Sequence, residues 1–469
     1  MNKISLLYSL LTFLSFYGEH TLEQPTNRPN IIFIITDDQQ TGLLGIEGAK
    51  EANTPHIDRI GQEGVLFKNA FVVTPLCSPS RASFLTGNYS HKHNVINNDK
   101  LGLDVVSHTL LTWPRQLRES GYETAFIGKW HMGLDDSRRP GFDRWFSFKG
   151  QGDYIDGVVN DEDVHLQTTG YMTDIINERA LDYLTKDHGN KPFAMVIAHK
   201  AIHWPLLPAT RHESLYTDFE FDSLEIKKSD IDGKPMLTRS VDRQAFYAYE
   251  NVLPEPPESR RGRGRKRSVV VADQLRCLAS VNEGIGEIFS ALEKSNQLDN
   301  TIIIYTSDNG MLMGQHGEFN IKRWAYDPVI RIPMLIRYPK LIPKGSIKEE
   351  MILNIDLAPT LLELAQIEPL EPMNGQSMVP LFEQSNAPWR SAFLTEYFLE
   401  KVAPRVRPWQ AVRTEDWKYI HYTEAEMPSE LYHLANDPSE EHNLIDQPSA
   451  QDQLKVMQQK LAQLLQESE

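Results

Sequence analysis

Cysteine is scarce in this chain, which has only Cys77 and Cys277 among its 469 residues. Small disulfide-rich scaffolds are excluded, because such chains are short and dense in cysteine. Cys277 lies within a helical hydrophobic pattern and is expected to be a core thiol. We therefore predict no disulfide between the two, which leaves Cys77 free for another role.

Positive charge is also in short supply, with 48 lysines and arginines against 64 aspartates and glutamates. The net charge of −16 argues against a general nucleic-acid-binding protein. Long hydrophobic runs are absent beyond the N-terminus, so no membrane-spanning segment is expected. The apolar run at residues 4–17 follows Lys3 and is too short to span a bilayer, but it fits a secretory signal peptide over residues 1–20. We therefore expect a secreted or periplasmic protein.

Continuous apolar runs mark several strands that are buried on both faces, at residues 30–36, 193–198 and 301–307. Helical patterns at residues 173–185 and 269–295 alternate with these strands. Such alternation predicts an α/β sandwich, with a sheet covered by helices. From residue 386 the pattern changes to short strands and a terminal helix. We predict a catalytic domain over residues 28–385 and a small antiparallel subdomain over residues 386–469.

Two of the buried strands end in acidic or amide side chains: Asp37 and Asp38 after the first, Asp308 and Asn309 after the last. The carboxyl ends of parallel strands meet at one edge of a sheet, where ligands normally bind. Oxygen ligands of this kind suit Ca²⁺ or Mg²⁺, and clustered carboxylates repel one another without a cation. The alternative is that each pair only caps the next element.

Basic side chains lie on further loops that are expected at the same edge. These residues are Lys129, His131, His203, His316 and Lys322. A single histidine would be interpreted as structural. Together with the acidic pairs, the set suits a tetrahedral anion held on a metal ion, with charge clamps and an acid–base pair.

Cys77 lies between two prolines and is followed by Arg81. Pro75 and Pro79 bias their neighbours away from helix, which predicts a constrained loop. A helix is expected to follow, with Ser80 as its N-cap and Gly87 at its end. The positive field at that position favours a thiolate or an anionic ligand. An inert buried thiol is the alternative interpretation.

These stretches carry a family resemblance. Residues 77–81, Cys-Ser-Pro-Ser-Arg, resemble the Cys-x-Pro-x-Arg signature of type I, formylglycine-dependent sulfatases. Residues 128–131 resemble the second motif of that family, and Asp37-Asp38 and residues 307–310 resemble its metal motifs. The order is the same over residues 28–445. Residues 141–145, 150–152 and 199–203 look closest to bacterial carbohydrate sulfatases related to N-acetylglucosamine-6-sulfatase.

The resemblance implies an alkaline phosphatase-like sandwich, with a large central mixed sheet between helices and a small C-terminal antiparallel sheet with a terminal helix. It implies that Cys77 is oxidised to formylglycine, by a formylglycine-generating or an anaerobic sulfatase-maturating enzyme. It also implies a bound cation, Ca²⁺ rather than Mg²⁺. The ligands carried over are Asp37, Asp38, residue 77, Asp308 and Asn309.

The resemblance further implies roles in the hydrolysis of sulfate esters on a carbohydrate, such as fragments of glycosaminoglycan, mucin or algal polysaccharide. Arg81 and Lys129 would hold the aldehyde hydrate, whose hydroxyl attacks sulfur. Lys129 and Lys322 would clamp the sulfate oxygens. His203 would protonate the departing alcohol, and His131 would remove the second hydroxyl proton to expel sulfate.

Some assignments stay open on the sequence alone. Trp204 either stacks on a sugar ring or packs in the protein, and His316 either binds the substrate or is structural. The basic run at residues 260–267 is either a solvated loop or a steering surface for a sulfated polyanion. Competing functions are a phosphate or phosphonate monoester hydrolase and a catalytically dead binder of sulfated glycans. A cysteine hydrolase using Cys77 and His131 would leave the acidic residues unexplained.

Overall fold

The computed structural model describes residues 28–98, 102–218, 233–235, 267–317, 319–383, 387–401, 403, 406–424 and 427–469. The signal peptide expected at residues 1–20 lies outside this part, as does nearly all of the basic run at residues 260–267. The expected domain boundary at residues 385 and 386 also falls outside it. Within the described residues, no helix has both the length and the apolar character needed to cross a bilayer.

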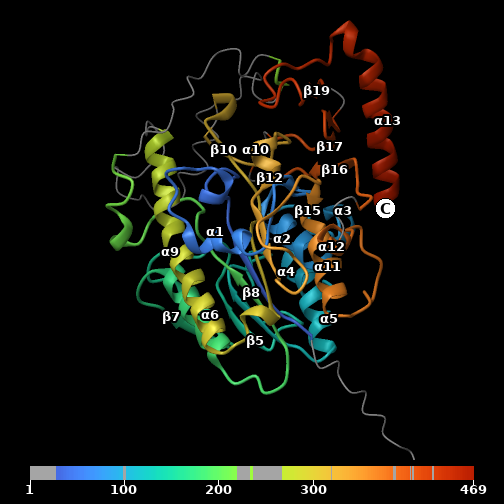
Figure 1. Cartoon of the computed structure of the whole chain (residues 1–469). Coiled ribbons are helices and arrows are strands. Elements are labelled where there is room, and N and C mark those ends of the chain that lie inside the picture. The colour runs from blue at the N-terminus through green and yellow to red at the C-terminus, as the bar shows by residue number, and fades with distance from the viewer. Residues whose placement is uncertain are drawn as a thin grey trace, which may run out of the picture.

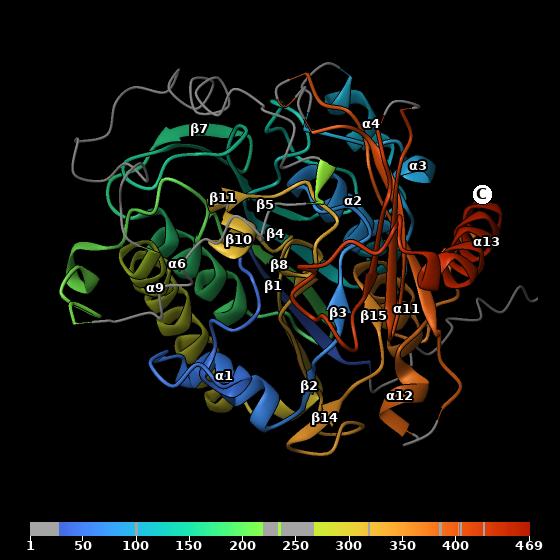
Figure 2. The ribbon, with the colours of Figure 1, turned by 90° about the horizontal axis from the view of Figure 1, so that it is seen from above.

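A ten-stranded mixed sheet forms the centre of the molecule (Figures 1 and 2). In spatial order its strands are β14 (Ser346–Lys348), β2 (Val65–Phe67), β13 (Met334–Arg337), β9 (Thr301–Ser307), β1 (Asn30–Thr36), β8 (Phe193–Ala198), β4 (Glu123–Gly128), β5 (Arg144–Ser147), β6 (Val158–Asp161) and β7 (Val164–Gln167). The strands from β9 to β5 are parallel, whereas β13, β6 and β7 pair antiparallel with their neighbours. All residues of β1, β8 and β9 are buried, which confirms the interpretation of their continuous apolar runs.

Helices cover both faces of this sheet (Figure 2). Alternate residues of β1 supply the two faces: Phe33 packs in one core cluster, and Ile32 packs in the other. The helices on the first face include α2 (Cys77–Thr86), α5 (Trp113–Glu119) and α11 (Leu357–Leu364), and those on the second include α1 (Pro55–Gln62), α6 (Met172–Thr185) and α9 (Arg267–Lys294). The predicted α/β sandwich is therefore confirmed.

Shorter elements connect these layers. The helices among them are α3 (Ser90–His93), α4 (Leu103–Thr109), α10 (Asp327–Ile330) and α12 (Val379–Glu383). One small sheet has the order β12 (Arg331–Ile332), β3 (Ala70–Phe71) and β15 (Ile352–Leu353), and another joins β10 (Leu312–Met313) to β11 (Phe319–Ile321). Single turns of 3-10 helix occur at η1 (Gly45–Glu47), η2 (Thr210–His212), η6 (Leu298–Asn300), η7 (Gln315–Gly317), η8 (Asn354–Asp356) and η9 (Pro448–Ala450).

The C-terminal part forms a separate antiparallel sheet, as predicted. Its strands are β16 (Ala392–Tyr397), β17 (Trp409–Thr414), β18 (Trp417–Tyr422) and β19 (Glu430–His433). The terminal helix α13 (Gln451–Ser468) packs against β16, β17 and β18 (Figure 1). We refer to residues 387–469 as the C-terminal subdomain.

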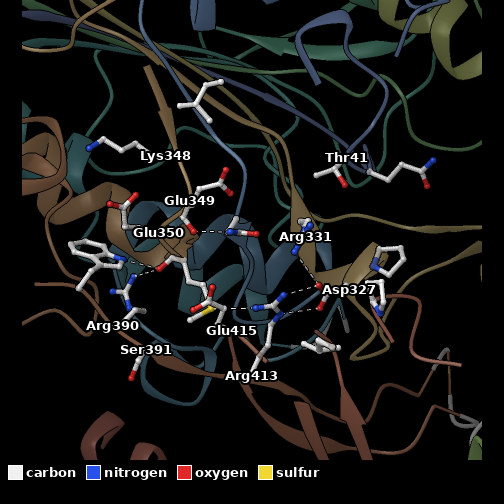
Figure 3. A pocket seen from close by; sticks show the side chains of 18 of the residues that line it. Thr41, Asp327, Arg331, Lys348, Glu349, Glu350, Arg390, Ser391, Arg413 and Glu415 are labelled. Carbon is white, nitrogen blue, oxygen red and sulfur yellow. Dashed lines mark hydrogen bonds and ion pairs between the residues drawn. The ribbon is translucent and has the colours of Figure 1, made fainter. Parts of the chain in front are cut away.

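A cavity of about 950 Å³ lies where the C-terminal subdomain meets the main domain (Figure 3). Several charged side chains of its walls form ion pairs. The Asp327 carboxylate at the start of α10 accepts hydrogen bonds from both Arg413 on β17 (3.1 Å from Nη2) and Lys418 on β18 (2.6 Å from Nζ). Arg331 lies 3.2 Å from the same carboxylate, and Arg390 pairs with Asp356 nearby. Asp327 therefore links the main domain to two strands of the C-terminal subdomain.

Replacing Asp327 with asparagine is expected to lower the free energy of unfolding by about 3 kcal/mol, because Lys418 and Arg413 would lose their shared counter-ion in a buried setting. Burial alone would raise the pKa of the Asp327 carboxyl, but Lys418, Arg413 and Arg331 hold it well below its usual range. The carboxylate therefore stabilises the folded state above the unfolded-state pKa, and this contribution is lost as the pH falls. Urea unfolding should show a difference between wild type and D327N that shrinks below about pH 4.

Asp452 provides a matched control, because its side chain is 99% exposed and forms an ion pair with Lys455, which is 70% exposed. Asp452→Asn should change the stability by less than about 0.5 kcal/mol. Equal effects of the two substitutions would contradict the assigned role of Asp327.

Candidate active site

The acidic residues converge because β1 and β9 are parallel neighbours with Thr36 opposite Ser307. The next residues of each strand, Asp37 and Asp308, therefore leave the same edge of the sheet. One ligand atom from each of Asp37, Asp38, Asp308 and Cys77 lies within 4.8 Å of the others, and all four side chains are buried. The structure thus brings together the residues that the sequence assigned to a metal site.

These residues fit a hard divalent cation. Among the described residues, the buried Oδ1 of Asn309 has no hydrogen-bond partner, while its Nδ2 donates to Asp38 Oδ1 at 2.7 Å. Burial and the charge of Asp37 raise the pKa of Asp308 to about 6, although Arg81 acts in the opposite direction. Carboxylate and amide oxygens in this number are the ligands that Ca²⁺ prefers. Asp37, Asp38, Asp308, Asn309 and residue 77 could hold such an ion.

Each carboxylate also has a basic partner, which the sequence argument about repulsion did not include. Lys129 Nζ contacts Asp37, Lys322 Nζ donates to Asp38 Oδ1 at 2.7 Å, and Arg81 Nε donates to Asp308 Oδ2 at 2.8 Å. The lysine and arginine charges therefore compensate those of the carboxylates. A divalent cation would compete with these basic groups for the carboxylates. The lysine and arginine side chains would then be available to bind an anion.

Cys77 is the first residue of α2, and Leu76 is the N-cap in an extended conformation. The prediction of Ser80 as the N-cap was therefore wrong. Pro79 is accommodated because the N–H groups of a first helical turn have no partner within the helix, so its missing N–H costs nothing there. The Ser80 hydroxyl instead accepts from Asn354 Nδ2 at 3.0 Å. Gly87 ends the helix with φ of 72°, as predicted.

Of the options that the sequence left open at Cys77, the surroundings disfavour the thiolate. Burial and the nearby Asp37 carboxylate raise the pKa of the Cys77 thiol to about 12. Asp37 Oδ1 lies 3.6 Å from Sγ, and Lys322 Nζ, at 2.8 Å, does not offset these effects. Because a thiol attacks only as its thiolate, this setting disfavours a cysteine hydrolase. Cys77 and Cys277 form no disulfide, as expected.

The remaining candidate residues surround the same cluster. His203 Nε2 lies 3.5 Å from Asp38 Oδ2, and Arg81 Nη1 donates to the Lys129 carbonyl at 2.7 Å. His131 has a left-handed backbone with φ of 57°, and its buried Nδ1 has no hydrogen-bond partner in the described part of the chain. Burial, with the charge of Lys129, lowers the pKa of His131 well below its usual value. A neutral imidazole with a free nitrogen can accept a proton.

Trp204 and His316 have different surroundings. Trp204 is partly buried against the second core cluster, so its ring is packed on one side and partly exposed. His316 is buried and lies against the Tyr326 ring, with 4.6 Å between the ring centroids. The contacts of both residues are thus those of packed side chains, and their binding of substrate stays a prediction.

Sequence reasoning missed a group of side chains that lies between the loop carrying Lys129 and the loop carrying His203. Gln151 Oε1 accepts from Lys129 Nζ, and Lys200 Nζ donates to the Gln151 carbonyl at 3.1 Å. The Lys200 ammonium also lies 4.9 Å from the ring centroid of Tyr154, whose hydroxyl donates to the His203 carbonyl at 2.7 Å. Residues 151–154 therefore connect the Lys129 loop to the His203 loop. The signal in the sequence was that Gln151 and Lys200 lie in two of the stretches, residues 150–152 and 199–203, that resemble carbohydrate sulfatases.

Comparison with known proteins identifies this arrangement. Residues 29–367 match the sulfatase family. The chain belongs to the sulfatase family. Residues 314–467 of this sulfatase also match the family described as N-sulphoglucosamine sulphohydrolase, C-terminal. As a family member with the signature residues in place, it is a sulfuric ester hydrolase.

Two relatives match this sulfatase over most of its length. It is 33% identical to the N-acetylglucosamine-6-O-sulfatase of Bacteroides thetaiotaomicron, over 89% of this chain and 82% of that protein. It is 30% identical to the N-acetylglucosamine-6-sulfatase of Homo sapiens, over 88% of this chain and 80% of that protein. The predicted relationship to carbohydrate sulfatases of this kind is confirmed.

Solved structures confirm the alkaline phosphatase-like fold. A protein in complex with its substrate, D-glucosamine-2-N,6-O-disulfate, superposes with a TM-score of 0.80 at 31% identity, over 94% of this chain and 98% of that one. A phosphonate monoester hydrolase of Agrobacterium radiobacter shares the fold, with a TM-score of 0.72 at 22% identity, over 94% of this chain and 96% of that one.

Added Ca²⁺ is expected to raise the melting temperature of the wild-type sulfatase, because an ion that binds only the folded state stabilises it. Asn309→Ala removes one oxygen ligand and should weaken this response, shifting the Ca²⁺ concentration at half-effect upward by about tenfold or more. A thermal-shift titration measures both quantities without any substrate.

Asn160 on β6 is the control, since it is also buried and donates its side-chain amide to the Asp136 carbonyl at 2.9 Å. Asn160→Ala should lower the melting temperature without changing the Ca²⁺ dependence. A Ca²⁺ response that is the same in N309A and in wild type would exclude Asn309 as a ligand.

Proposed function

We propose that this sulfatase removes sulfate ester groups from a carbohydrate, with 6-O-sulfated N-acetylglucosamine units as the preferred substrate. The observation that carries the proposal is the set of basic groups gathered around Cys77 and the acidic cluster. The sugar assignment is supported by the relatives, which are N-acetylglucosamine-6-sulfatases. The carbohydrate sulfate esters would come from fragments of glycosaminoglycan, mucin or algal polysaccharide.

Formylglycine at residue 77, as its hydrate, would supply the attacking hydroxyl, and a divalent cation at the acidic cluster would supply Lewis acidity. Arg81 is held by Asp308 and by the Lys129 carbonyl, so its guanidinium is fixed beside residue 77. Lys322 Nζ is 2.8 Å from the Cys77 sulfur, which is within reach of a sulfate group bound at that residue. Lys129 and Lys322 would thus bind sulfate oxygens from two sides.

The two histidines would handle protons. Burial lowers the pKa of His203 to about 3, although Asp37 and Asp38 act in the opposite direction, so the free imidazole is neutral at pH 7. The negative charge of a bound sulfate ester would favour its protonated form, which then donates to the departing alcohol oxygen. His131, with its free nitrogen, would accept a proton from residue 77 when sulfate leaves.

Two alternatives differ from this proposal in testable ways. A phosphate or phosphonate monoester hydrolase on the same fold remains the closest competitor, because phosphate is also a tetrahedral anion. Every potential metal-binding group of histidine, cysteine, aspartate and glutamate found among the described residues includes Asp37 and Cys77, which supports a single metal centre. A dead sulfated-glycan binder is disfavoured because each residue required for turnover is present.

We further propose a maturation partner and a location. Conversion of Cys77 requires a formylglycine-generating or an anaerobic sulfatase-maturating enzyme. The apolar segment near the N-terminus supports export to the periplasm or the medium.

Cys77→Ala should lower kcat/KM on a 6-O-sulfated N-acetylglucosamine substrate by more than about three orders of magnitude, because it removes the nucleophile. Cys277→Ala, the matched control at the other buried cysteine, should keep the activity. Mass spectrometry of the peptide that contains residue 77 should show formylglycine in wild type produced with a maturation enzyme. Unchanged desulfation by C77A would refute the proposed nucleophile.

A substrate panel tests the sugar assignment separately. Sulfate release should be fastest from 6-O-sulfated N-acetylglucosamine and at least about tenfold slower from its 3-O- and 4-O-sulfated isomers, in which the ester cannot reach residue 77 with the same ring placement. A higher kcat/KM on an aryl phosphonate than on every sulfate ester would favour the competing function.

A further inference from the structure

Glu400, which follows β16, connects the C-terminal subdomain to two segments near Cys77: the one that contains Asn98 and the one that contains Arg323. Its side chain is 0% exposed. One carboxylate oxygen, Oε2, accepts from Arg323 Nε and from the Tyr397 hydroxyl. The other oxygen, Oε1, accepts from the backbone N–H of Asn98 at 2.9 Å.

The first connection leads to Lys322. Arg323, the next residue, has a left-handed backbone with φ of 82°, which is strained for a residue with a side chain. Its N–H donates to the Pro75 carbonyl at 3.2 Å, and Trp409 Nε1 donates to its carbonyl at 2.9 Å. With its side chain held by Glu400, Arg323 is fixed at three points. Lys322 comes directly before Arg323 in the chain, and its Nζ lies 2.8 Å from Cys77 Sγ.

The second connection leads to the start of α2. The Asn98 backbone is held by Glu400, and Asn98 Oδ1 accepts from the Ser78 N–H at 3.0 Å. Ser78 is the second residue of α2, so its N–H has no partner within the helix. Since Leu76 offers no side-chain cap, Asn98 caps the helix in its place. The cap orients the first turn, which contains Cys77.

We propose that Glu400 is a positioning residue of the active site. It fixes the distance between residue 77 and Lys322 by holding Asn98 on one side and Arg323 on the other. The C-terminal subdomain is then part of the catalytic apparatus, although it supplies no group that touches the reacting atoms. This inference rests on the proposed function only where its test uses turnover.

Glu400→Gln keeps the side-chain shape and removes the charge that holds Arg323. We expect kcat on a small aryl sulfate, per mole of formylglycine, to fall about 10- to 100-fold, as for other residues that orient catalytic groups. KM should change far less. Glu400→Asp keeps the charge but is too short to hold both partners. Its kcat should therefore be intermediate between those of wild type and E400Q.

Glu440→Gln is the matched control. Glu440 is also 0% exposed and belongs to the same subdomain, but it accepts from Lys418 Nζ at 2.6 Å and from the Asp327 N–H at 2.7 Å, away from Cys77. E440Q should lower the melting temperature at least as much as E400Q and leave kcat unchanged, when both are assayed well below their melting transitions. Equal losses of kcat in the two variants would overturn the proposal.

Hydrogen exchange supplies a readout that needs no activity. In E400Q, amide exchange within residues 74–82 should be faster than in wild type, because the Ser78 cap and the Pro75 contact are loosened. E440Q should match wild type there. Unchanged exchange in E400Q overturns the positioning role, whatever the enzyme hydrolyses. Failure of the wild type to release sulfate, with faster exchange in E400Q, would instead refute the proposed function alone.

Discussion

Three buried carboxylates at the ends of β1 and β9, with the three buried cations that pair with them, constrain the rest of the molecule. Asp37, Asp38 and Asp308 are almost completely shielded from water, and Lys129, Lys322 and Arg81 neutralise them at short range. Such a group is costly to bury and holds together only if every position is fixed. The fully buried parallel strands and the two helical layers provide this rigidity. Substitutions in these strands and helices beneath the site are therefore expected to disturb the positions of the charged groups.

Much of this arrangement is readable from local sequence. The apolar runs of β1, β8 and β9 predict strands buried on both faces, and polar residues at their ends predict where ligands bind. The failures have a common cause. The thiolate option at Cys77 considered only the helix terminus and Arg81, but burial and Asp37, which is distant in sequence, raise the pKa of the thiol. Ser80 was assigned as the N-cap for the same reason, since its partner Asn354 lies far along the chain.

The supporting contacts are the least predictable part. Gln151 and Lys200 lie in stretches that resemble the family, but no residue pattern marks the contact between them, and Glu400 lies outside every motif. Part of what these residues contact is backbone, namely the Gln151 carbonyl and the Asn98 N–H. Contacts to backbone carbonyls and N–H groups leave no pattern of residue types on the partner side. The C-terminal subdomain is a related case: its short strands were predicted from the sequence, but its ionic contacts with Asp327 were not.

The burial of Cys77 also sets a sequence of events during synthesis. Cys77 is 0% exposed in the folded chain. Asp38 and Asp308, which contact each other in the acidic cluster beside it, are 270 residues apart in the sequence. Lys322, which contacts the Cys77 sulfur, lies 245 residues further along the chain, so the thiol cannot be fully enclosed until that part of the chain has been made. A reagent or enzyme that acts on the sulfur would therefore reach it before folding is complete. For the conversion of residue 77 proposed above, the rate of folding would then matter alongside the affinity of the maturation enzyme.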